Sequence, residues 1–93
     1  MSTANSDDVG DDPIAYFLQD IAYQGKSERT RTAYERVLRD FEQFLAEEGE
    51  NVLADATHRE CMAYIHTLRG PMAESTVATY ASYLHRFYGY MTQ

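Results

Sequence analysis

The chain has 93 residues, 44% of them hydrophobic, and a formal net charge of −7, so it can form one domain around one modest core. Its single cysteine, Cys61, excludes an internal disulfide and a thiolate metal cluster, as is usual in a reducing cytoplasm. No apolar run approaches the ~20 residues of a membrane span and no signal-peptide pattern opens the chain, so we expect a cytoplasmic protein without membrane contact.

The charges are unevenly distributed along the chain. Residues 1–12 hold four acids and no base, and residues 40–60 hold seven acids against one base. Residues 26–39 hold five bases against two acids, and residues 75–93 hold no acid. A polyanion can therefore still bind at residues 26–39 and 75–93, despite the negative net charge. The overall acidity suggests a protein from a halophile, and an ordinary acidic surface is the alternative.

Four helices are expected after a disordered acidic tail at residues 1–12. The first spans residues 13–24, with Asp12 as N-cap, Pro13 at its first position and Gly25 at its end. Its apolar side chains recur at helical spacing. They are Ile14, Phe17, Leu18 and Ile21.

The second helix is expected over residues 28–48, between an N-cap at Ser27 and a stop at Gly49. It is the longest of the four and carries the longest apolar stripe. The stripe contains Tyr34, Val37, Leu38, Phe41, Phe44 and Leu45.

The third helix is expected over residues 58–69, where Thr57 and Glu60 form a capping box and Gly70 and Pro71 end the helix. Its inward side chains are Cys61, Ile65 and Leu68, with Tyr64 or Met62 beside them.

The fourth helix is expected over residues 76–91, with Ser75 or Glu74 at its cap. Its core residues are Val77, Tyr80, Leu84, Phe87 and Met91. No segment alternates with a period of two, so we expect no strands and an all-α bundle of two helical hairpins.

The faces opposite the core stripes of the second and fourth helices carry hydroxyl and basic side chains. Such side chains can donate to phosphate oxygens or base edges, whereas a merely solvated helix face is the alternative. The candidate DNA-binding residues are Lys26, Arg29, Arg31, Thr32, Arg36, Arg39, Ser75, Thr76, Thr79, Ser82 and Arg86.

Three ordered motifs over residues 13–93 resemble the N-terminal core-binding domain of tyrosine recombinases, the family of phage integrases and Xer-type recombinases. The first motif comprises Ser27, Thr30, Tyr34, Leu38, Phe41 and Phe44 or Leu45. The second comprises Thr57, Cys61, Tyr64 and Ile65. The third comprises Glu74, Ser75, Thr76, Val77, Leu84, Phe87, Tyr88, Tyr90 and Met91.

The resemblance implies a SAM-like four-helix domain whose second and fourth helices lie across the major groove during site-specific DNA recombination or integration. The implied partners are double-stranded DNA, the C-terminal catalytic domain of the parent recombinase, and further protomers in an oligomer on DNA. The acidity of this chain departs from the usually basic family domains.

No catalysis is expected in this chain. The family's His-x-x-Arg motif is absent, because His85 and Arg86 are adjacent, and no tyrosine is expected to act as a nucleophile. We expect no cofactor and no metal site. The alternative function is a helical protein–protein interaction module in which Tyr83, Tyr88 and Tyr90 form an exposed aromatic patch. A helix-turn-helix regulator is disfavoured because the connection over residues 47–57 is long.

Overall fold

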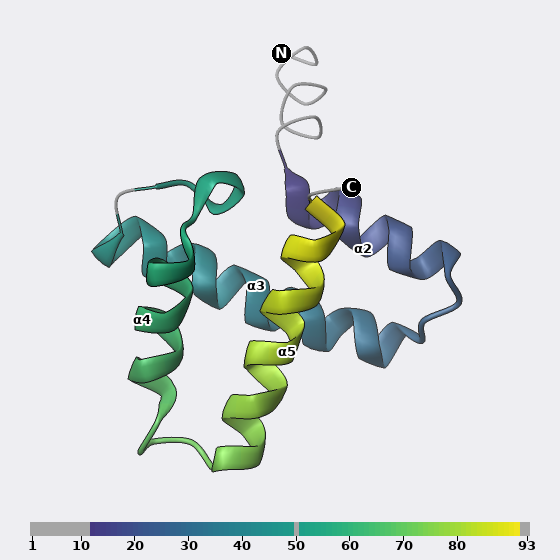
Figure 1. Ribbon diagram of the computed structural model, residues 1–93. Coiled ribbons are helices and arrows are strands. Elements are labelled where there is room, and N and C mark those ends of the chain that lie inside the picture. Colours follow the sequence, from purple (N-terminus) through teal and green to yellow (C-terminus); the bar gives the residue numbers. More distant parts are fainter. Residues whose placement is uncertain (1–11, 50, 92–93) are drawn as a thin grey trace.

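The computed structural model describes residues 12–49 and 51–91 (Figure 1). Within these ranges there is one 3₁₀ turn, η1 (Leu53–Asp55), and an isolated bridge between Arg69 and Met72, but no strand. The helices are α2 (Pro13–Tyr23), α3 (Glu28–Glu48), α4 (His58–Leu68) and α5 (Glu74–Met91). The all-α prediction is confirmed. The tail predicted to be disordered over residues 1–12 lies outside the described residues except for Asp12, which caps α2.

The four helices pack as two hairpins. Helix α2 packs against α3, and α4 packs against α5. The hairpins meet where α5 crosses α3, and α4 crosses the other half of α3 (Figure 1). This arrangement matches the all-α bundle of two helical hairpins that the sequence predicts.

The predicted starts of α2 and α4 are confirmed by their hydrogen bonds. The Asp12 carboxylate accepts from the amides of Ile14 at 3.2 Å and Ala15 at 3.4 Å, at the start of α2. The Thr57 hydroxyl accepts from the amide of Glu60 at 3.1 Å, and the Glu60 carboxylate accepts from the amide of Thr57 at 3.0 Å. Both halves of the capping box therefore form, and they satisfy amides that lack partners within α4.

The helix ends differ in how they use glycine. Gly25 at φ +89° and Gly70 at φ +96° adopt left-handed backbone conformations that other residues rarely take. Gly49 ends α3 in an extended conformation instead, with its amide donating to Leu45. Helix α5 begins at Glu74, two residues before the predicted start, because the Val77 amide already donates to the Ala73 carbonyl.

The core lies between the two hairpins and largely follows the predicted stripes. The buried side chains are Ile14, Phe17, Ile21, Tyr34, Val37, Leu38, Phe41, Leu45, Leu53, Tyr64, Ile65, Leu68, Val77, Leu84 and Phe87. Of the two candidates beside the α4 stripe, Tyr64 is buried and Met62 is 49% exposed. Cys61 is only half-buried, and its pKa is raised because burial disfavours the thiolate and the Glu60 charge adds to this.

Leu53 joins the core although no sequence pattern predicts it. The turn η1 folds it inward, and the Tyr88 hydroxyl donates to its carbonyl at 2.6 Å. The hydroxyl of Tyr64 likewise donates to Asp40 on α3. These two bonds tie the long connection and α4 to the rest of the bundle.

The exposed aromatic patch at the end of α5 does not form. Tyr83 stacks on Tyr34 with ring centroids 4.0 Å apart, and Tyr90 meets Phe17 edge-on at 5.3 Å. Tyr88 is half-buried beside Leu53. Because all three rings pack against the core, they offer no continuous apolar surface to a partner.

Candidate nucleic-acid interface

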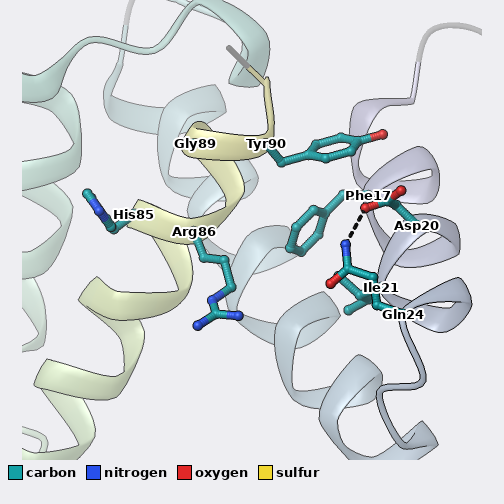
Figure 2. A pocket seen from close by; sticks show the side chains of 8 residues that line it. All are labelled: Phe17, Asp20, Ile21, Gln24, His85, Arg86, Gly89 and Tyr90. Carbon is teal, nitrogen blue, oxygen red and sulfur yellow. Dashed lines mark hydrogen bonds between the residues drawn. The ribbon is translucent and has the colours of Figure 1, made fainter. Parts of the chain in front are cut away.

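A polar cleft of about 380 Å³ opens between α2 and α5 (Figure 2). Arg86 projects into it from α5, opposite Asp20 of α2 and Gln24, the residue that follows α2. The Gln24 amide donates to the Asp20 carboxylate at 2.8 Å across one helical turn. We call this hollow the α2–α5 cleft. Its polar wall on α2 was not predicted, although the spacing of four residues between an acid and an amide was visible in the sequence.

Arg86 also lies near Tyr34 on α3. Burial raises the pKa of Tyr34, the positive charge of Arg86 partly opposes this, and Tyr83 raises it further. Arg31 lies one helical turn before Tyr34, and its guanidinium donates to the Lys26 carbonyl at 2.7 Å. Arg86 is therefore near Tyr34 in space, Arg31 precedes Tyr34 by one turn of α3, and Arg31 is bonded to the backbone of Lys26.

Other predicted residues on α3 face elsewhere. Thr32 and Arg36 are exposed on the side opposite Tyr34. Since the buried stripes of α3 and α5 face each other where the helices cross, their opposite stripes point away from each other. Arg36 and Arg86 therefore do not share one surface. Arg29 belongs to the same outward side of α3 as Arg36.

Arg39 is engaged by three carboxylates. Its guanidinium contacts Asp12 at 3.0 Å, Glu42 at 3.2 Å and Glu35 at 3.9 Å. The hydrogen bond to Asp12 is the main reason that the pKa of Arg39 is raised. Partial burial raises the pKa of Asp12, but the hydrogen bond from Arg39, aided by those from two backbone amides, outweighs it and leaves the pKa below its usual value. In this structure Arg39 links α2 to α3.

The hydroxyl residues of α5 differ in availability. Ser75 and Ser82 are exposed and Thr76 is half-buried. Thr79 is exposed, but its hydroxyl donates to the Ser75 carbonyl at 3.0 Å. Its single proton is thereby used within the helix, so a phosphate oxygen must compete for it.

The family model for the phage integrase N-terminal SAM-like domain matches residues 14–93. The chain belongs to this family. In tyrosine recombinases this integrase domain binds DNA, and the 93-residue sequence contains no catalytic domain. No curated protein and no solved structure matches the chain. The match gives no support to an origin in a halophile.

No helix in residues 12–49 and 51–91 is long and apolar enough to cross a membrane. Within the same ranges, no group of three or more His, Cys, Asp or Glu side chains could hold a metal ion.

Proposed function

We propose that this integrase domain binds double-stranded DNA as the N-terminal part of a tyrosine site-specific recombinase. The match over residues 14–93 carries this proposal, because the family domain binds DNA in such recombinases. Its role would be to hold the recombination site while the C-terminal catalytic domain of the parent protein cuts and joins the strands. Further protomers would assemble on the same DNA. We place this function in the cytoplasm, where the DNA of a recombination site would be reached.

We propose that DNA lies over the α2–α5 cleft and the start of α3, contacted by Lys26, Arg31 and Arg86. The support is the proximity of Arg86 to Tyr34, the position of Arg31 one helical turn before Tyr34 with its bond to the Lys26 carbonyl, and the exposure of the Arg86 side chain. Arginine can donate two hydrogen bonds to one phosphate or guanine. The half-buried Lys26 and serine or threonine hydroxyls can add single contacts to phosphate oxygens. Thr76, Thr79, Ser75 and Ser82 would flank this cluster along α5.

The predicted residues Arg29, Thr32 and Arg36 would then lie away from the main contact. Arg39 would serve mainly to hold α2 on α3, since three carboxylates surround it. Removing it would therefore lower stability as well as affinity. These assignments rank the candidate residues, and the ranking can be measured.

The test compares Arg86→Ala with Arg36→Ala, two exposed arginines whose loss changes the net charge equally. Fluorescence anisotropy with a labelled mixed-sequence duplex would be recorded over a salt series. Arg86→Ala should cost about 1–3 kcal/mol, or about 5- to 150-fold in affinity, and should lower the salt slope by about 1. Arg36→Ala should leave both close to the wild-type values. Thermal melting checks that both variants stay folded.

The opposite ranking would keep DNA binding but move the contact to the outward side of α3. An equal, small loss for both variants would indicate attraction by net charge alone. Absence of binding by the wild-type domain at low salt would reject DNA binding by this chain.

A further inference from the structure

A second surface of the molecule is apolar and basic, and the proposed DNA contact does not use it. Two adjoining hollows of about 410 and 390 Å³ lie along α4, and both are lined by Met62 and Ile65. The second hollow extends to Ala81 and His85 on α5. His85 also lines the edge of the α2–α5 cleft, and in Figure 2 its side chain points away from Arg86. We call the two hollows together the α4 groove.

The α4 groove has an unusual charge for so acidic a chain. No Asp or Glu lines either hollow, whereas Arg59, Arg69 and His66 line the first and His58 and His85 line the second. Among the described residues the ion pairs all involve Arg39, so the two groove arginines have no carboxylate partner there. Met62, at 49% exposed, supplies an accessible apolar floor. An occupant with an apolar side chain between carboxylates would fit this pattern.

The chain itself carries such a segment. Val52, which precedes η1, is 67% exposed, the most exposed large aliphatic side chain of the described residues. Glu48 at the end of α3 and Asp55 in η1 are exposed on either side of it in the sequence. The surrounding residues 40–60 hold seven acids against one base. An apolar knob with acidic flanks therefore stands on the same molecule as an apolar groove with basic flanks.

We infer that the α4 groove binds a second copy of this chain, with Val52 of one copy against Met62 of the other. The carboxylates at Glu48 and Asp55 then face Arg59 and Arg69, which orients the contact more than it strengthens it. Burying one valine and part of one methionine gives a weak interface by itself. The contact uses none of the residues proposed to touch DNA, so it stands or falls separately from that proposal.

Two variants separate the two halves of the contact. Val52→Lys removes the knob and keeps the groove, whereas Met62→Glu spoils the groove and keeps the knob. Wild-type amide shifts should change with protein concentration at Val52, Met62 and their neighbours, and sedimentation should show self-association. Each variant alone should lose this behaviour. An equimolar mixture of the two should recover association, because one intact knob still meets one intact groove.

The matched control is Tyr23→Lys, which replaces an 81% exposed ring on α2 and should leave self-association unchanged. Since Val52 and Met62 are exposed, both variants should melt near the wild-type temperature. The inference is overturned if the wild-type shifts do not depend on concentration. It is also overturned if the mixture fails to associate, or if the groove residues shift on adding duplex DNA but not on raising the protein concentration.

Discussion

Phe17 is the side chain that should contribute most to holding α2 on the bundle. It is 2% exposed, and its ring lies edge-on to Tyr34 of α3 and to Phe87 and Tyr90 of α5, with 5.3 Å between centroids in each pair. Phe17→Ala deletes the ring and leaves a cavity between three helices. Replacements of this kind cost about 3–5 kcal/mol. A domain of this length has a total stability of about 5–14 kcal/mol, so the substitution removes a large share of it.

The assay is urea unfolding followed by far-ultraviolet circular dichroism, with the slope m compared between variants. Tyr23→Ala is the matched control, because it removes an aromatic ring from the same helix at a position that is 81% exposed. It should change the free energy of unfolding by no more than about 0.5 kcal/mol. If Phe17→Ala cost less than about 1 kcal/mol, or no more than the control, the three ring contacts would not hold α2 in place.

Four other substitutions test the local reasoning. Asp12→Ala should lower the free energy of unfolding by about 0.5–2 kcal/mol through the lost N-cap. Because the pKa of Asp12 is lowered in the folded state, its contribution is present above about pH 4 and is lost as the pH falls through the folded pKa. The stability of the variant should therefore fall less steeply than that of the wild type as the solution is acidified. Tyr64→Phe should cost about 0.5–1.5 kcal/mol in thermal melting, since its hydroxyl donates to Asp40. At both Gly70 and Gly89 an added Cβ would meet no atom within 4 Å, so only the backbone conformation distinguishes the two sites. Gly70→Ala should destabilise the fold by about 1–2 kcal/mol because Gly70 has φ +96°. Gly89→Ala should stabilise it by about 0.5–1 kcal/mol because Gly89 lies within α5.

The helices were predictable because their signals are local. Asp12 followed by Pro13, and Thr57 followed by Glu60, satisfy backbone amides within one turn, so no distant residue has to be known. The start of α5 was less certain, because Glu74, Ser75 and Thr76 all suit a first turn. In the structure the Val77 amide donates to the carbonyl of Ala73, so the helix begins at Glu74.

Leu53 shows what local signals miss. It lies in the short apolar run Val52, Leu53 and Ala54, without the repeat that marks a buried helix face. Its burial depends on the turn η1 and on the Tyr88 hydroxyl, which comes from 35 residues further along the chain. A pattern search within one segment cannot supply a partner at that separation.

The prediction of the DNA-contacting residues was limited for a related reason, because it too depends on how distant segments pack. A helical wheel gives the direction of each side chain around its own axis, but not the angle between two axes. The wheel therefore selected Arg36 on α3 and Arg86 on α5 by one rule, although crossed helices turn those stripes apart. It also counted Arg39 as available, while Asp12, 27 residues earlier in the chain, pairs with it. The proposed function instead groups Arg86 with side chains near the core stripe at the start of α3, such as Arg31. Where two helices cross, a common binding surface is built from the flanks of their buried stripes, and the Arg86 and Arg36 comparison tests that geometric rule directly.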